Sequence, residues 1–318
     1  PEARRHEIRL QTQEEALAHF DQIDVYFCPF GTLWPRPVRK PSVLTFHDMQ
    51  ERFYPEFFTK QEHEERFFHY DWSLRMADAV IAVSAFTRDM AVQIAGASRW
   101  KFHVVHHVPD ALPPAEKPSG GNSDDDARPF VFYPANFWKH KNHLRLLSAM
   151  SRVRDAAPEL ALVCTGSLLG REAEWSEAVA AAGVGDCVRH LGTVRRAEIT
   201  WLYEHTRALV FPSLFEGFGI PLLEAMSCGL PVISTRWNGA DEIIRHMQNG
   251  ILCGTSADSI RSALQTLSGD NALRRRLGQE ARATAMKDFD LERNAAREGQ
   301  FIREIAGRVP VAQVRGVP

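Results

Sequence analysis

The sequence predicts an α/β protein with two Rossmann-like, doubly wound domains, in which helices cover both faces of a parallel β-sheet. The 318 residues are enough for two domains of about 100 to 200 residues each. Short runs of β-branched and aromatic residues alternate with helical patterns, as in βαβ units. Residues 111–129 interrupt this alternation with four prolines, two glycines and an acidic triplet, which is typical of a linker.

We assign residues 1–115 to the first domain and residues 116–129 to the linker. A parallel sheet usually places functional loops after its first strand, and a single strand candidate precedes residue 40 here. The start of the chain at Pro1 therefore leaves open whether this domain is incomplete. Its strand candidates are residues 24–30, 43–46, 79–83 and 102–108.

The second domain is predicted over residues 130–288, because strand and helix candidates continue to alternate beyond the linker. Its six strand candidates are residues 130–133, 160–164, 188–191, 208–212, 231–234 and 250–253. Three helices close the chain without strands between them, at residues 256–267, 272–286 and 291–305. We expect the segment 289–318 to cross back to the first domain.

Composition excludes several classes of protein. A net charge of −2 lacks the basic excess of a nucleic-acid-binding protein. Five scattered cysteines indicate a reducing compartment, and no apolar run approaches the roughly 20 residues of a membrane span. We therefore predict a cytoplasmic protein. The aromatic residues of segment 53–72 are open to two interpretations, a peripheral contact with a membrane or a lipid-linked ligand, and ordinary core packing.

The stretch FPSLFEGFGIPLLEAMSCGLPVIS, residues 211–234, reads as strand, turn and helix. The glycines in Gly217-Phe218-Gly219 allow a tight turn, and Pro221 suits the first turn of a helix. Gly229 is placed to end that helix. The free N–H groups at its N-terminus, aligned with the helix dipole, predict an anion site suited to a phosphate or diphosphate.

Two glutamates, Glu216 and Glu224, flank this predicted anion site. Each carboxylate has two oxygens and accepts hydrogen bonds from both members of a vicinal diol, which ribose and pyranose rings share. The arrangement therefore suits a nucleotide-sugar, with one ring on each side of a diphosphate. The alternative is a helix start whose glutamates only complement the dipole or lie in solvent.

Several segments together resemble the retaining glycosyltransferases of family 4, which have the GT-B fold. Besides residues 211–234, they are TFHDMQERFYPEFF (45–58), ADAVIAVSAFTRDM (77–90), YPANFWKHKN (133–142), LGTVRRAEITWLYEHTRALVFPS (191–213) and FDLERNA (289–295). The resemblance implies two domains facing a central cleft, the first on the acceptor side and the second binding the nucleotide-sugar. It also implies metal-independent, front-face transfer of a hexose to a saccharide or lipid-linked saccharide, gated by closure about the linker.

The resemblance also implies roles for individual residues. Glu216 would contact the donor hexose, Gly217, Phe218 and Gly219 its phosphate and hydroxyls, and Glu224 the ribose. Lys141 would bind the diphosphate, where a fixed cation stabilises the departing charge; its alternative role is that of a solvated lysine at a helix start. Thr193 and Val194 would lie near the nucleobase.

One feature of the family is absent from this sequence. Relatives often carry an arginine upstream of the lysine, in the loop that begins near Asn136, and no arginine stands there. Lys139 is the candidate replacement, although an ammonium is a point charge and lacks the bidentate fork of a guanidinium.

His47 follows a predicted strand and matches a histidine that faces the donor sugar in relatives. A lone histidine is often structural, but the carboxyl end of a strand is where open α/β sheets bind ligands. We count His47, Lys141 and Glu216 as the candidate catalytic residues. Ser84 and Arg88 follow another strand and are weaker candidates.

We predict no metal site and no cofactor besides the nucleotide-sugar substrate. Asp124, Asp125 and Asp126 satisfy a D-x-D pattern, but they lie in the linker rather than after a buried strand. The histidine pairs 106–107 and 140/143 lack further ligands that would complete a zinc site.

The amino-acid sequences of segments 47–58 and 137–142 are similar to those of bacterial mannosyl-type enzymes of polysaccharide assembly. GDP-mannose is therefore the expected donor. Two alternatives stay open: a donor-binding regulator of the same fold without turnover, and a nucleotide-sugar epimerase. The acceptor and the oligomeric state are not encoded in any pattern that we identify.

Overall fold

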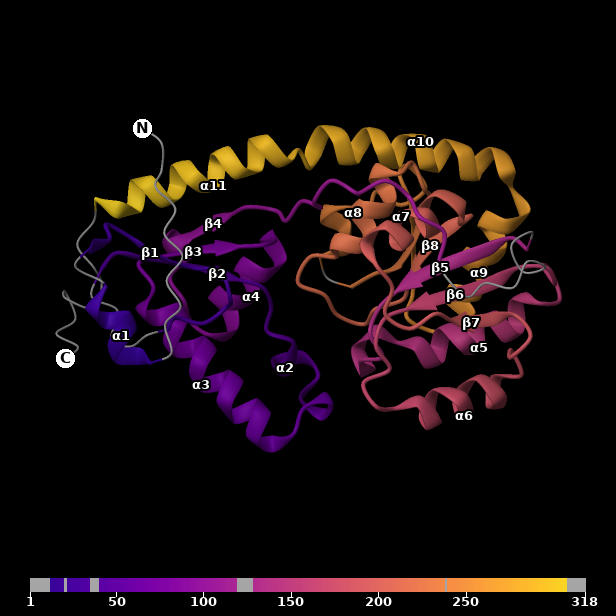
Figure 1. Ribbon diagram of the computed structural model, residues 1–318, viewed down its shortest axis with the longest axis horizontal. Coiled ribbons are helices and arrows are strands. Elements are labelled where there is room, and N and C mark those ends of the chain that lie inside the picture. The colour runs from indigo at the N-terminus through magenta and orange to yellow at the C-terminus, as the bar shows by residue number, and fades with distance from the viewer. Residues whose placement is uncertain (1–11, 20–21, 35–39, 119–127, 238, 308–318) are drawn as a thin grey trace. The chain divides into compact units, whose positions relative to one another are not determined.

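The computed structural model describes residues 12–19, 22–34, 40–118, 128–237 and 239–307 (Figure 1). The chain divides into two compact units. Unit 1 contains Pro1–His106 and Ala295–Pro318, and unit 2 contains His107–Asn294. The acidic triplet at residues 124–126 lies outside the described residues.

Unit 1 contains a parallel sheet with the strand order β1-β2-β3-β4. Its strands are β1 (Tyr26–Cys28), β2 (Ser42–Phe46), β3 (Ala79–Ala82) and β4 (Phe102–Val104). All four lie at the predicted positions, which confirms this part of the sequence analysis. The helices are α1 (Gln13–Ala18), α2 (Gln50–Phe53), α3 (Lys60–Met76) and α4 (Ala85–Ile94), with 3-10 turns η2 (Pro55–Phe57) and η3 (Arg99–Lys101).

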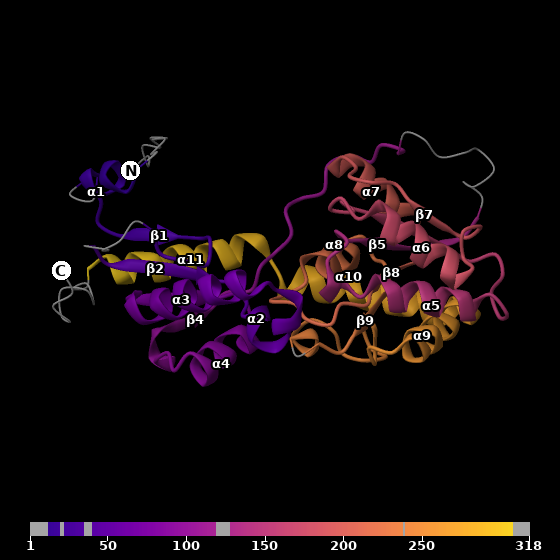
Figure 2. The same cartoon turned by 90° about the horizontal axis from the view of Figure 1, so that it is seen from below.

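Both faces of the sheet in unit 1 are buried. Successive strand residues point to opposite faces, so neighbouring residues belong to different buried clusters. Leu44 and Val80 belong to one buried cluster. Val43 and Ala79 belong to the other, together with Ile305 of helix α11 (Leu291–Ala306). Figures 1 and 2 both show α11 running beside this sheet. The last helix of the chain therefore completes the core of the unit that contains the first strands.

Unit 2 contains a parallel sheet with the strand order β10-β9-β8-β5-β6-β7. The chain runs outward from β5 to β7, returns to the other side of β5, and runs outward again to β10. The topological switch point therefore lies between β5 and β8. The strands are β5 (Phe130–Pro134), β6 (Ala161–Thr165), β7 (Val188–His190), β8 (Ala208–Phe211), β9 (Val232–Thr235) and β10 (Ile251–Cys253), as predicted.

Helices cover both faces of this sheet, so unit 2 is doubly wound. Figure 1 shows α5 and α6 on one side and α7 and α8 on the other. The helices are α5 (His143–Val153), α6 (Glu172–Ala182), α7 (Arg196–His205), α8 (Ile220–Ser227), α9 (Ala257–Gly269) and α10 (Asn271–Asp288), with 3-10 turns η5 (Lys139–Lys141) and η6 (Ala240–Glu242). The three predicted closing helices are thus confirmed as α9, α10 and α11. Among the described residues, no helix combines the length and apolarity needed to cross a membrane.

Candidate functional site

The candidate site of unit 2 is built on the two strands that flank the switch point. β5 is followed by the loop that leads into η5 and Lys141, and β8 is followed by the loop that contains Glu216. Because β5 and β8 are parallel neighbours, both loops leave the sheet at the same edge. Ligands of open α/β sheets bind outside this edge at the switch point.

Lys141 and Glu216 meet directly at this edge. Lys141 Nζ lies 2.6 Å from Glu216 Oε1, and the side chains are 18% and 13% exposed. The ammonium also lies 5.5 Å from the centre of the Phe211 ring, at the end of β8. Partial burial strengthens an ion pair relative to one in open water. The sequence analysis assigned both residues to the binding of the donor. In the structure the two side chains are in direct contact.

Backbone and side-chain hydrogen bonds fix the turn that carries Lys141. Asn142 adopts a left-handed conformation with φ 60°, and its Nδ2 donates to the carbonyl of Pro212 at 2.9 Å. The hydroxyl of Tyr133 donates to the carbonyl of Lys141 at 2.7 Å. The N–H of Leu214 donates to the carbonyl of His140 at 2.7 Å. The lysine is therefore held on a backbone that is tied to the neighbouring loop.

The histidine after this turn adds no charge to the site. His143 is buried, and its ring contacts the rings of Tyr133, Phe137 and Trp175. Burial lowers the pKa of His143 to about 3. Its imidazole is therefore neutral at physiological pH and adds no positive charge beside Lys141.

The glycine-rich turn has a backbone conformation that favours glycine. Gly219 has φ +100° and is the N-cap residue of α8, with no side chain capping the helix. A Cβ at this position would lie 3.1 Å from Leu222 and 3.2 Å from Trp237, so both the backbone angle and the space favour glycine. Phe218 is buried, and its ring contacts those of His107 and Phe289. The binding of an anion here remains a prediction.

Glu224 is held by two residues that the sequence analysis missed. Arg196 Nη1 donates to Glu224 Oε1 at 2.7 Å, and the Tyr203 hydroxyl donates to Glu224 Oε2 at 2.8 Å. Burial raises the pKa of Tyr203 well above its ordinary value, so the phenol keeps the proton that it donates. Both partners lie on α7, and no local spacing indicates that α7 packs against α8 at this carboxylate.

Replacing Tyr203 with phenylalanine should destabilise the protein by about 2 kcal/mol, because a hydrogen bond to a buried charged group is lost. Urea unfolding of Tyr203→Phe, Glu224→Gln and the double variant would measure this. We expect the two single costs not to add, since both variants break the same contact. Fully additive costs would show that the contact contributes little.

The remaining predicted residues of unit 2 lie on loops around this edge. Asn136 Oδ1 accepts from the N–H of Ser167 at 2.8 Å and so links the loops after β5 and β6. Lys139 lies in the same turn as Lys141 and is exposed. Thr193 and Val194 lie in the loop between β7 and α7. Arg196, the first residue of α7, donates a hydrogen bond to Glu224, so this loop lies near that carboxylate.

An arginine does reach the loop after β5, although it comes from another segment. Arg171 Nη1 donates to the carbonyl of Phe137 at 2.7 Å. Its Nε and Nη2 donate to Glu174 at 2.8 and 2.5 Å. The guanidinium therefore braces the loop through contacts within the protein, and it does not replace the arginine that the sequence lacks near Asn136.

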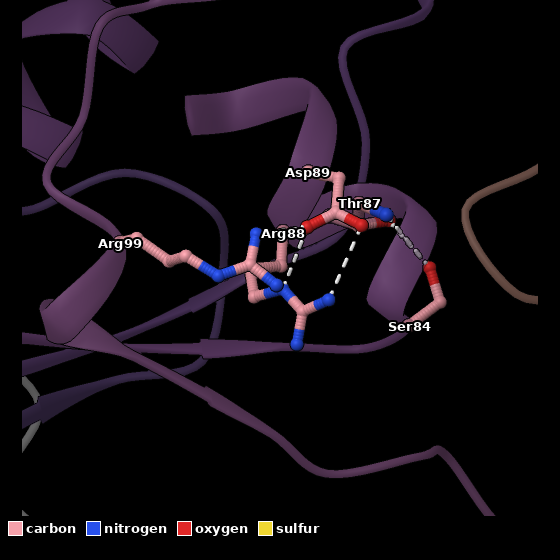
Figure 3. A network of polar contacts seen from close by, with 5 residues as sticks. All are labelled: Ser84, Thr87, Arg88, Asp89 and Arg99. Carbon is pink, nitrogen blue, oxygen red and sulfur yellow. Dashed lines mark hydrogen bonds and ion pairs between the residues drawn. The ribbon is translucent and has the colours of Figure 1, made fainter. Parts of the chain in front are cut away.

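The candidates of unit 1 follow the neighbouring strands β2 and β3. His47 follows β2 directly, and its Nε2 lies 2.7 Å from the carbonyl of Pro29, so Nε2 carries the proton. Ser84 is buried and caps α4, as Figure 3 shows. Arg88 forms a two-point contact with Asp89, at 2.8 and 3.2 Å, and Arg99 reaches the same carboxylate at 2.7 Å. In this structure Arg88 is thus part of an ion-pair network within unit 1.

Ser84 has a clear structural role at the start of α4. Its Oγ accepts from the N–H of Thr87 at 2.9 Å. Ser84→Ala should therefore lower the stability by about 1 kcal/mol, whereas Ser84→Thr should retain most of the cap. Thermal unfolding of the two variants would measure the difference; equal melting temperatures would argue against a capping role.

No group of three or more His, Cys, Asp or Glu side chains is arranged to hold a metal ion in the parts of the chain that the structure describes. The histidine pairs at 106–107 and 140/143 therefore gain no ligands from elsewhere in those parts.

Comparisons with known proteins agree with this architecture. A family model described as Glycosyl transferases group 1 matches residues 116–284, and one described as Glycosyltransferase Family 4 matches residues 3–111. D-inositol 3-phosphate glycosyltransferase of Arthrobacter sp. (strain FB24) is 32% identical over 155 residues, which cover 48% of this chain and 37% of that protein. O-antigen chain mannosyltransferase B of Escherichia coli is 44% identical over 57 residues, or 18% of this chain and 15% of that protein. The matched region thus spans little more than a third of the first relative and less of the second.

A solved structure extends the likeness to both units. The crystal structure of Anabaena Alr3699/HepE in complex with UDP-glucose has a TM-score of 0.77 and 20% identity, covering 92% of this chain and 82% of that one. Together with the two Rossmann-like parallel sheets, this likeness confirms the predicted GT-B fold class. Because the first family model matches just over half of the 318 residues, the chain belongs to the glycosyl transferases group 1 family.

Proposed function

We propose that this protein is a retaining glycosyltransferase that moves a hexose from a nucleoside-diphosphate sugar to a saccharide or lipid-linked saccharide. The observation that carries the proposal is the contact between Lys141 and Glu216 at the switch point of unit 2. A cation and a carboxylate side by side suit a diphosphate and a sugar hydroxyl, respectively. Membership of the glycosyl transferases group 1 family supports the same reaction class.

In the proposed mechanism, Lys141 stabilises the departing nucleoside diphosphate as negative charge grows on its terminal phosphate. The bond between the anomeric carbon and the phosphate oxygen breaks, and a bond to the acceptor oxygen forms on the same face of the sugar. The proton of the acceptor hydroxyl passes to the departing phosphate oxygen. Glu216 positions the hexose by accepting from its hydroxyls, and no metal ion is required.

Glu224 is the proposed partner of the ribose. Each oxygen of its carboxylate already accepts one hydrogen bond from α7, at 2.7 Å from Arg196 and 2.8 Å from Tyr203. A carboxylate oxygen has two acceptor positions, so one position on each oxygen is left for the two ribose hydroxyls. The α7 contacts would then orient the carboxylate before the nucleotide arrives, which lowers the entropic cost of binding.

GDP-mannose is the first donor to test. The 44% identity over 57 residues to O-antigen chain mannosyltransferase B supports mannose, whereas the solved relative was crystallised with UDP-glucose. Incubation with a panel of GDP-, UDP- and ADP-sugars, followed by the release of nucleoside diphosphate, would identify the donor. We expect slow hydrolysis of one donor in the absence of acceptor. Failure of every member to bind or react would contradict the proposed function.

A donor-binding protein without turnover is the second candidate, and one observation favours it. Arg171, the arginine beside the loop after β5, is engaged by Glu174 and by the carbonyl of Phe137. The diphosphate would then meet fewer cations than in relatives with an arginine in this loop. Titration calorimetry would distinguish the two candidates, since tight binding of an intact donor without hydrolysis or transfer would indicate the regulator.

A further inference from the structure

The end of β2 and the segment that follows it bury several polar atoms without a hydrogen-bond partner. They include Thr45 Oγ1, Gln50 Nε2 and both carboxyl oxygens of Glu51. Folded proteins pair nearly all of their buried polar atoms, and an exception requires an explanation. The concentration of such atoms within residues 45–51 indicates that this segment is built to receive a polar ligand.

Among these groups, the buried carboxyl group of Glu51 reduces the stability of the fold the most. Its side chain has no exposed surface, and the nearest cation that contacts it, Arg52 Nε, lies 3.6 Å from Oε1. That distance is longer than a hydrogen bond. The guanidinium of Arg52 is instead directed to Asp71, with Nη2 at 2.7 Å from Oδ1. Without a hydrogen-bond partner from another residue, a buried carboxyl group destabilises the fold.

The charged groups around Glu51 come from the loop before α2, from α2 itself and from α3. Burial raises the pKa of Glu51 to about 7, and the charge of Asp48 also raises it, whereas a hydrogen bond from the backbone of Glu51, Arg66 of α3 and Arg52 lower it. Tyr70 of α3 faces the same cluster, since burial raises its pKa and the charges of Arg66, Asp48 and Glu51 also act on it. The 3-10 turn η2 contributes Glu56, which is exposed.

The position of Glu51 favours a ligand. It lies four residues after His47, beyond the carboxyl end of β2, where open α/β sheets bind their substrates. The guanidinium of the neighbouring Arg52 lies 3.7 Å from the centre of the Phe67 ring and covers one face of it, while Phe67 is 43% exposed. Aromatic faces attract the partly positive C–H groups of sugar rings, and carboxylates accept from sugar hydroxyls.

We propose that Glu51, with Gln50 and Asp48 beside it, is a specificity-determining residue that accepts hydrogen bonds from hydroxyls of a neutral acceptor saccharide. The proposal rests on the proposed glycosyltransferase function and names the acceptor's contact in unit 1. A neutral ligand fits because Arg52 is already neutralised by Asp71, while Arg66 and Asp48 carry opposite charges near Glu51. Because the side chain of Glu51 has no exposed surface, it must turn outward for a saccharide to reach its carboxyl group, and binding then supplies the missing hydrogen-bond partners.

This proposal predicts a distinctive pH dependence. Acceptor hydroxyls donate to the ionised carboxylate, so the saccharide lowers the pKa of Glu51 when it binds. Affinity for the acceptor should therefore increase as the pH rises from about 6 to about 8, by up to ~tenfold for each unit of pKa shift. In Glu51→Gln the dependence should disappear, because an amide does not titrate in this range.

The experiment uses the whole chain and simple acceptor probes, methyl α-D-mannopyranoside and methyl β-D-glucopyranoside. Their binding to wild type, Glu51→Gln and Glu51→Asp is measured by calorimetry and ligand-observed NMR across this pH range. We expect Glu51→Gln to bind the preferred probe at least ~tenfold more weakly at the upper end, which is the effect of losing one hydrogen bond to a charged group. Glu51→Asp should bind weakly but regain the pH dependence.

Donor hydrolysis in the absence of acceptor provides the second readout. It should be unchanged in Glu56→Gln, whose exposed side chain lies in the adjoining turn η2, and this would show that a substitution near the segment leaves the donor site intact. Equal probe affinity in wild type and Glu51→Gln, a flat wild-type profile, or no probe binding at all would overturn the proposal. If the wild type hydrolyses no donor, this result would instead overturn the glycosyltransferase function. The binding measurements would still test the role of Glu51.

Discussion

Lys141→Ala should lower the rate of glycosyl transfer roughly a thousandfold, with a much smaller effect on the KM for the acceptor. Removing one preorganised group that stabilises developing negative charge costs about 10²- to 10³-fold in rate. Here the ammonium is fixed by its 2.6 Å contact with Glu216 and by the hydrogen bonds of η5, so its loss removes a positioned charge. Turnover at saturating donor would measure the effect.

Lys287→Ala is the matched control, because Lys287 is an exposed lysine at the end of α10. We expect wild-type turnover from it. A rate within a few-fold of wild type for Lys141→Ala would remove the proposed site from the reaction.

Stability offers a further test of the same pair. Lys141→Ala leaves Glu216, which is only 13% exposed, without its cation, so the variant should also unfold more easily. The double variant Lys141→Ala/Glu216→Ala should recover stability without recovering activity. Recovery of both would show that the ion pair acts on the fold rather than on the reaction.

Glu51→Gln should raise the free energy of unfolding by about 3 kcal/mol at alkaline pH and change it little in mild acid. The folded-state pKa of about 7 lies above the ordinary value of 4.5. The folded protein therefore holds a proton that the unfolded chain releases, and stability falls as the pH rises from about 4.5 to about 7. Glutamine does not titrate in this range, so the free energy of unfolding of Glu51→Gln should not fall with pH in this way.

Urea unfolding of wild type and Glu51→Gln at several pH values would measure the difference. Glu56→Gln is the control, because Glu56 is an exposed glutamate in the adjoining turn η2. Its curve should follow that of the wild type at every pH. Parallel pH profiles for wild type and Glu51→Gln would contradict the inferred protonation of the buried carboxyl group.

A variant that is both more stable and less able to bind saccharide would have a clear meaning. Proteins retain destabilising buried polar groups mainly where function requires them. The two measurements on Glu51 therefore distinguish a binding role from a structural one, since a purely structural carboxyl group would not lose ligand affinity when its replacement stabilises the fold.

Much of the architecture could be predicted because it is encoded locally. Most of the strands are short, mainly apolar runs, and the stretch around Gly217 shows strand, turn and helix in order. The same stretch pointed to Glu216, whereas Lys141 was assigned from the resemblance of segment 133–142 to the glycosyltransferase family. Their mutual contact could not be predicted, because it depends on which strands become neighbours in the sheet.

The residues that the sequence analysis missed share one physical cause. Arg196 and Tyr203 precede Glu224 by 28 and 21 residues and reach it only because α7 packs beside α8. Glu51 stands among charged and polar residues that resemble an exposed helix. Its burial depends on how α2 packs against α3, which begins at Lys60, and the residue pattern of α2 alone does not indicate this contact. Such features appear only when separate elements have been placed in three dimensions.

The burial of Ile305 beside Val43 and Ala79 has a practical consequence for expressing parts of this protein. A fragment ending at residue 106 would expose an apolar sheet face to water and should aggregate, even though it contains every strand of its own sheet. A peptide spanning residues 295–306, added separately or joined through a flexible tether, should restore its solubility. Residues up to 106 and residues 295–306, which are far apart in sequence, must therefore be produced together.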